Sequence, residues 1–151
     1  MRWLLLSLTL LASGCGFHLK GSYEMPAAYR QVTLTSFDQY ARITTLVSQS
    51  LAGSGVALGQ GPEVHILSDN LDRQTLSLFS TGQVAEYELV YSLKWQLIRE
   101  GQEPQVHVIE VRRDYQDDPA RTLAKDRERD LLLEEMRKEA ADRLVRQLAL
   151  D

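Results

Sequence analysis

Apolar and polar side chains alternate most regularly between residues 85 and 97. Apolar side chains occupy every odd position and polar ones all but one of the even positions: Ala85, Tyr87, Leu89, Tyr91, Leu93, Trp95 and Leu97 alternate with Glu86, Glu88, Ser92, Lys94 and Gln96. Successive side chains of a strand point to opposite faces, so this period of two predicts a long antiparallel strand with one wet face. A turn at Gly101–Pro104 and a strand-like segment at Val106–Tyr115 predict that the two strands form a hairpin.

Two segments have apolar side chains spaced by three or four residues, which is typical of amphipathic helices. The first begins near Gln39, where Asp38 is a candidate N-cap. It ends at Gly53 or Gly55, because glycine accepts the positive φ common at helix ends. The second runs from about Thr122 to Leu150 and contains neither proline nor glycine. We therefore expect one short and one long helix.

Weaker strand patterns occur at residues 31–35 and 64–79, the latter with an interruption around Ser68–Asn70. The glycine-rich run at 53–61 is interpreted as turns, because a dinucleotide-binding loop would open a helix instead of following one. The element order is then β-α-β-β-β-α. It predicts the α+β class: a two-layer sandwich in which both helices cover one face of a mainly antiparallel or mixed four-stranded sheet.

The N-terminus has the pattern of a secretory signal peptide. Arg2 precedes an apolar stretch, Trp3–Leu11, which is well short of the roughly 20 residues that a membrane-spanning helix needs. Small residues then lead to Cys15, and Leu11–Cys15 resembles the bacterial lipobox. That resemblance implies cleavage before Cys15, with an S-diacylglycerol and an N-acyl chain on this cysteine.

The lipobox divides the chain into three parts. We expect residues 1–14 to be cleaved, residues 15–28 to form a lipidated tether and residues 29–151 to form a single α+β domain. Gly16 follows the cysteine where many inner-membrane lipoproteins carry an acidic residue, so the resemblance points to the outer membrane. Two or more acyl chains hold a protein stably on a bilayer, which makes Cys15 an anchor.

Composition and charge exclude several classes of function. The chain has 17 Lys and Arg against 21 Asp and Glu, for a net charge of −4, so it has no overall basic field for nucleic acid. Its single cysteine rules out an intrachain disulfide. The histidines lack metal-site spacing, and no nucleophile motif is present. We expect no catalytic residue, metal or cofactor apart from the acyl groups at Cys15.

Charged residues concentrate near the C-terminus, where 22 of the 38 follow residue 109. Their alternating signs along the long helix are typical of a solvated face, or of a surface that meets a partner or an anionic headgroup. The acidic pairs Asp117–Asp118 and Glu134–Glu135 are the only hint of an envelope hydrolase, and such pairs are usually exposed surface.

Three strings resemble the LptE family of lipopolysaccharide-assembly lipoproteins. They are CGFHL at 15–19, GQVAEY at 82–87, and the stretch 123–136, which contains LAKD at 123–126 and EEM at 134–136. The resemblance implies an outer-membrane lipoprotein on the periplasmic side, which plugs the LptD β-barrel, assists its assembly and contacts lipopolysaccharide. A polar exterior suits a plug, because the lumen of such a barrel is polar. The alternative function is a free-standing periplasmic lipid-binding lipoprotein with an apolar pocket.

The resemblance also supplies candidate site residues. Lys125, in the LAKD string, is the first candidate for the lipopolysaccharide phosphates, with a surface ion pair as its alternative role. Some relatives carry a basic residue just before the GQ string, where this chain has Phe79–Thr81, and Arg73 farther back is the second candidate.

Candidates for the partner interface come from the GQVAEY string: Gly82, Gln83, Glu86 and Tyr87. Two of them have an alternative role in the fold. Gly82 would form a hairpin turn, and Tyr87 would be a core aromatic.

Overall fold

The computed structural model describes residues 25–151. The expected signal peptide at 1–14, the lipidation site Cys15 and most of the tether lie outside the described residues. The elements in chain order are η1 (Ala27–Tyr29), β1 (Gln31–Ser36), α2 (Arg42–Gly53), β2 (Ala57–Leu78), β3 (Val84–Ile98), β4 (Gln105–Gln116), η2 (Pro119–Arg121) and α3 (Thr122–Leu150).

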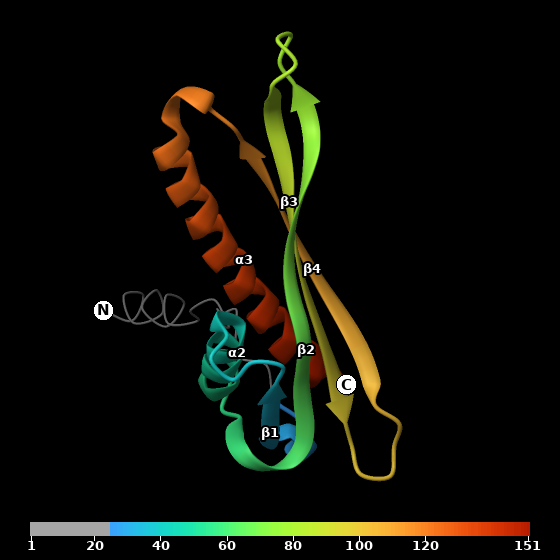
Figure 1. The fold of residues 1–151 in the computed structure, drawn as a ribbon. Coiled ribbons are helices and arrows are strands. Elements are labelled where there is room, and N and C mark those ends of the chain that lie inside the picture. The colour runs from blue at the N-terminus through green and yellow to red at the C-terminus, as the bar shows by residue number, and fades with distance from the viewer. Residues whose placement is uncertain (1–24) are drawn as a thin grey trace, which may run out of the picture.

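The four strands form one mixed sheet in the order β1-β2-β3-β4. β1 runs parallel to the first part of β2, with α2 as the connection, and the other neighbours are antiparallel. Both helices lie on one side of the sheet, and the β2–β3 hairpin extends well past α2 (Figure 1). The expected α+β sandwich is confirmed. The expected hairpin of two long strands is confirmed as β3 and β4.

The hydrophobic core lies between the sheet and the helices at the end of the molecule that holds α2. The alternation in β3 places five fully buried side chains on the helix side: Leu89, Tyr91, Leu93, Trp95 and Leu97. α2 adds Ile43, Val47 and Leu51. α3 buries side chains only from Met136 onward. We call the other end of the molecule, around the β2–β3 turn and the start of α3, the distal end.

Two expected boundaries were wrong. α2 begins at Arg42, not near Gln39, and Ala41 is its N-cap residue. The carboxylate of Asp38 instead accepts a hydrogen bond from the Tyr40 backbone N–H at 2.8 Å, in a turn that precedes the helix. The strand expected at residues 64–79 also begins earlier, at Ala57, so that part of the glycine-rich run belongs to β2.

The interruption expected around Ser68–Asn70 is a change of register within a continuous strand. Between Ile66 and Ser68 the pairing of β2 with β3 shifts by one residue. A bulge of this kind exchanges the faces of all later side chains, since side chains alternate along a strand. Even positions such as Ile66 face the core before the bulge, whereas odd positions such as Leu71 pair with core residues of β3 after it.

Gly61 should be the least replaceable glycine of the β1–β2 pair. A Cβ atom there would lie 2.1 Å from the backbone oxygen of Gln31, so β1 would have to move. We expect Gly61→Ala to lower the free energy of unfolding by about 1–3 kcal/mol, the range for overpacking. Gly53→Ala is the matched control, because nothing lies within 4 Å of the added atom. Equal stability of both variants in urea titrations would contradict this close approach.

Candidate functional site

Four side chains from four elements form a row at the distal end, on the sheet face that carries the core. The Arg73 guanidinium of β2 lies over the Tyr87 ring of β3, 4.3 Å from its centroid. Tyr87 stacks on Tyr115 of β4, with centroids 6.4 Å apart. The Nζ of Lys125 on α3 lies 5.3 Å from the centroid of Tyr115. We call this set the tyrosine row: two cations at the ends of a pair of stacked rings.

The sheet register explains why the row forms. Tyr87 and Tyr115 are directly opposite each other on neighbouring antiparallel strands, where cross-strand side chains contact. Arg73 is opposite Leu89, two residues from Tyr87 on the same face. A cation over an aromatic face is attracted by the ring quadrupole. The row thus extends the alternation of β3 beyond the apolar core.

Tyr115 attaches the start of α3 to the sheet. Its side chain is buried, and its hydroxyl donates a hydrogen bond to the backbone oxygen of Lys125 at 2.9 Å. Burial raises the pKa of Tyr115, and the carboxylate of Asp117 raises it further. Tyr115 therefore remains a neutral donor in ordinary buffers. Its hydroxyl binds the backbone of Lys125, and its ring lies beside the Lys125 ammonium.

The Lys125 ammonium is already paired. Nζ donates a hydrogen bond to Glu128 Oε2 at 2.8 Å, one turn along α3. This hydrogen bond raises the pKa of Lys125 above its ordinary value. The alternative role considered for Lys125, a surface ion pair, is therefore its state in this structure. Among residues 25–151, Arg73 has no carboxylate partner within ion-pair distance, which distinguishes the two candidate cations.

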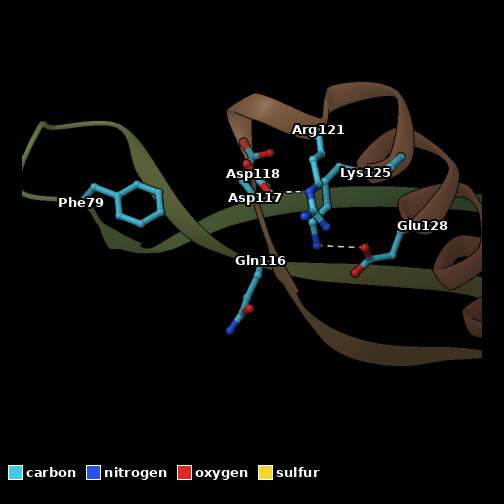
Figure 2. Close-up of a pocket in the computed structure, with 8 residues that line it drawn as sticks. Phe79, Gln116, Asp117, Asp118, Arg121, Lys125 and Glu128 are labelled. Atoms are coloured by element: carbon cyan, nitrogen blue, oxygen red, sulfur yellow. Dashed lines mark hydrogen bonds and ion pairs between the residues drawn. The ribbon is translucent and has the colours of Figure 1, made fainter.

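An open pocket of about 480 Å³ lies beside Lys125 (Figure 2). Its lining is mainly charged: Phe79, Gln116, Asp117, Asp118, Arg121, Ala124, Lys125 and Glu128. Arg121 is 3.7 Å from Asp118, so both cations of the pocket have an acidic partner. A neighbouring pocket of about 360 Å³ shares Lys125 and Glu128 and includes Leu76 and Glu86. Their charged linings suit a polar headgroup better than an acyl chain.

The four interface candidates of the GQVAEY string do not form one cluster. Gly82 has a φ of +84° in the β2–β3 turn, a conformation that glycine adopts without strain. Gln83 closes this turn through its backbone oxygen, which accepts from the Phe79 N–H at 2.7 Å. The carboxylate of Glu86 accepts from Ser77 Oγ at 3.0 Å. Only Tyr87 belongs to the tyrosine row.

The sheet face opposite the helices is mainly polar, although Val106 and Val108 of β4 also lie on it and are about half exposed. Arg112 connects Glu88 of β3 with Glu110 of β4 through hydrogen bonds of 2.8 and 2.9 Å. The rest of this face is formed mainly by polar side chains of β2 and β3, namely Ser68, Asn70, Asp72, Gln74, Ser92, Lys94 and Gln96. No helix in the described part of the chain covers it (Figure 1). We call this surface the open face.

A partly buried polar contact lies on the core side of the sheet. The Tyr91 hydroxyl donates to Asp69 Oδ2 at 2.8 Å, and Arg137 Nε on α3 lies 3.7 Å from the same oxygen. Burial raises the pKa of Tyr91, and the hydrogen bond to Asp69 adds to the effect. The contact joins β2, β3 and α3 where the apolar packing ends.

One member of each acidic pair has a structural partner. Asp118 accepts a hydrogen bond from the Ala120 N–H at 3.0 Å, which caps η2. Glu134 pairs with Arg42 at the start of α2, and the hydrogen bond from Arg42 lowers the pKa of Glu134. Within residues 25–151, no three His, Cys, Asp or Glu side chains are grouped so as to hold a metal ion. No helix in this range is long and apolar enough to cross a membrane.

Comparison with known proteins gives consistent matches. The family model described as "LptE: Lipopolysaccharide-assembly" matches residues 29–148. A relative from Pectobacterium atrosepticum, named LPS-assembly lipoprotein LptE, is 37% identical over 145 residues, covering 92% of this chain and 79% of its own. A relative of the same name from Photorhabdus laumondii is 34% identical over 151 residues, which cover 96% of this chain and 83% of the relative.

Solved structures agree with these matches. The rare lipoprotein B from Shewanella oneidensis superposes with a TM-score of 0.74 and 44% identity, covering 79% of this chain and 93% of that one. A lipoprotein B from Nitrosomonas europaea, at 23% identity, has a TM-score of 0.71, and the match covers 89% of this chain and 91% of that one. This second likeness concerns the fold alone.

The fold and these relatives define the class: small bacterial lipoproteins built from a four-stranded sheet with two helices on one face. Within that class, the chain belongs to the LptE family of lipopolysaccharide-assembly proteins. The resemblance stated from the three sequence strings is confirmed.

Proposed function

We propose that this chain is an outer-membrane lipoprotein, held on the periplasmic side through acyl chains on Cys15. It plugs the LptD β-barrel, assists assembly of that barrel and contacts lipopolysaccharide during transport to the cell surface. It acts by binding and not by catalysis. The observation that carries the proposal is the family match across residues 29–148.

The open face supports the role of a plug. A barrel lumen is lined by polar side chains and water, and a body placed inside must present polar surface to it. The strands present such a polar surface on the open face, where Arg112 lies between its two carboxylate partners. α3 presents charged side chains on the other side of the molecule.

The tyrosine row supports the contact with lipopolysaccharide. Phosphates form strong charge-assisted hydrogen bonds with arginine and lysine, and the row places Arg73 and Lys125 at its two ends. The distal end also exposes apolar side chains next to the row, with Leu76, Leu78 and Phe79 about half exposed. The charged pockets there argue against the alternative of a free-standing carrier, which needs an apolar pocket for an acyl chain.

Co-purification tests the proposed partner. The full chain, tagged at its C-terminus, is extracted in detergent from a Gram-negative host, and the LptD barrel is expected in the same fraction. Photo-crosslinkers at Ser92 on the open face and at Arg127 on α3 then record which side contacts the barrel. A tagged protein that elutes without any barrel, and gives no crosslink from either position, would contradict the role of a plug.

Charge reversal tests the proposed lipid contact. We expect Lys125→Glu and Arg73→Glu each to weaken lipopolysaccharide binding about tenfold, because each replaces a cation that can face phosphate by an anion. The fold and the association with the barrel should be unchanged. Lys138→Glu is the matched control, since Lys138 is exposed on α3 outside the distal pockets. Unchanged binding in either variant would remove that residue from the site.

A further inference from the structure

The Glu128 carboxylate occupies the place beside the Lys125 ammonium that an anionic ligand would need. The ammonium has the ring of Tyr115 on one side, 5.3 Å away, and Glu128 Oε2 at 2.8 Å. The side chain of Lys125 is 19% exposed, whereas that of Glu128 is 50% exposed. Lys125 is thus held by the sheet, and Glu128 is free to leave into solvent. Figure 2 shows Lys125 and Glu128 among the residues that line the pocket.

The charge of the pocket has the wrong sign for an anion while this pair is closed. Three carboxylates, from Asp117, Asp118 and Glu128, line it together with the two cations Arg121 and Lys125. Since Arg121 lies beside Asp118 and Lys125 beside Glu128, an entering phosphate would meet no unpaired cation there. An exposed ion pair is weak in water, and a phosphate monoester carries more negative charge than a carboxylate, so it attracts the Lys125 ammonium more strongly. Exchange of one partner for the other is therefore favourable.

We propose that Glu128 is a built-in competitor for the ligand of Lys125, so that it sets the affinity of the distal site for a phosphate-bearing lipid headgroup. The inference rests on the proposed contact with lipopolysaccharide and adds a determinant to it. Binding swings the Glu128 carboxylate away from Lys125, and the phosphate takes its place against the ammonium. The ring and backbone contacts of Tyr115 keep Lys125 in position during the exchange. Glu128 therefore acts on the ligand through Lys125, with which it is paired.

Binding of lipopolysaccharide to the full-length variants tests the competitor. We expect Glu128→Gln to bind about three- to fivefold more tightly than wild type, because the amide no longer neutralises Lys125. Glu135→Gln is the matched control: it makes the same charge change on the same helix, and Glu135 is exposed outside the distal pockets. In a Lys125→Gln background, Glu128→Gln should have less than a twofold effect. Lipopolysaccharide stripped of its lipid A phosphates should bind both forms equally.

A second measurement is independent of lipid. The pKa of Lys125, followed by NMR of its side chain, should fall in Glu128→Gln, since the hydrogen bond from Lys125 to Glu128 is the main cause that raises it. Wild-type binding with no gain in Glu128→Gln would overturn the competitor while leaving the lipid contact standing. A gain that persists without Lys125 would overturn it as well. Absence of phosphate-dependent binding in wild type and in Glu128→Gln would overturn both the lipid contact and the competitor.

Discussion

Replacing Cys15 with alanine is expected to release the protein from the outer membrane. Each buried methylene of an acyl chain contributes about 0.8 kcal/mol to membrane binding, and two or more chains anchor a protein stably. Removal of the thiol removes all of this energy. The variant should appear in the soluble periplasmic fraction, and metabolic labelling with a fatty acid should no longer mark it.

The barrel must be depleted in this experiment, because association with it would also retain the protein in the membrane. Ser22→Ala is a suitable control, since it changes the expected tether without touching the anchor. A Cys15→Ala protein that stays in the membrane of barrel-depleted cells would contradict lipidation as the attachment. Mass spectrometry of the wild-type N-terminal peptide would show the acyl chains directly.

Trp95→Ala should cause the largest loss of stability among single changes in the core. Trp95 is 1% exposed near the C-terminal end of β3, and its ring stacks on His107 of β4 at 4.4 Å between centroids. Truncation of a buried aromatic costs about 3–5 kcal/mol through lost transfer energy and the remaining cavity. Native domains are stable by only about 5–15 kcal/mol, so the variant should be close to unfolding at ordinary temperature.

Urea unfolding followed by circular dichroism measures this effect in the non-lipidated Cys15→Ala background. Tyr40→Ala is the control, because Tyr40 is 85% exposed in the loop before α2. Surface changes of this kind stay within about 0.5 kcal/mol. If Trp95→Ala unfolded at the same urea concentration as Tyr40→Ala, Trp95 would not be a main contact of the core.

The parts of the fold that the sequence predicted well are those in which one residue pattern repeats without a break. β3 alternates from Ala85 to Leu97 with one exception, and its pairing with β4 continues without a register shift from Glu86 to Leu97. The length of α3 was predicted closely, because no proline or glycine interrupts it. The apolar positions Met136, Ala140, Leu144 and Leu148, which are spaced by four, are buried as this pattern predicts, whereas the apolar residues of the first turns are not.

β2 shows why the other boundaries were missed. Its pairing with β1 jumps from Leu58 to Glu63, and Gly61 lies against the backbone of β1 between these residues. Glycines that permit a close backbone approach are indistinguishable in sequence from glycines that form turns. The later bulge after Ile66 breaks the period of two within a continuous strand. Periodicity alone cannot reveal a strand that changes phase.

The candidate site was predicted in part. The family strings and the basic residues singled out Arg73, Tyr87 and Lys125, and the structure brings these three into one row. Tyr115 was missed as a member, although its place in the predicted hairpin, opposite Tyr87, was a usable signal. Glu128 had no signal beyond its three-residue spacing from Lys125, because many charges alternate along this helix.

Because the core lies at one end of the molecule, stability of the fold is separated from the chemistry of the distal surface. The apolar contacts that keep the chain folded are concentrated near α2, while the distal end is held by strand pairing, stacked rings, ion pairs and the hydrogen bond from Tyr115 to the Lys125 backbone. Substitutions around the β2–β3 turn therefore leave most of the folding energy untouched. The sequence of that tip can therefore change without redesign of the body that carries it.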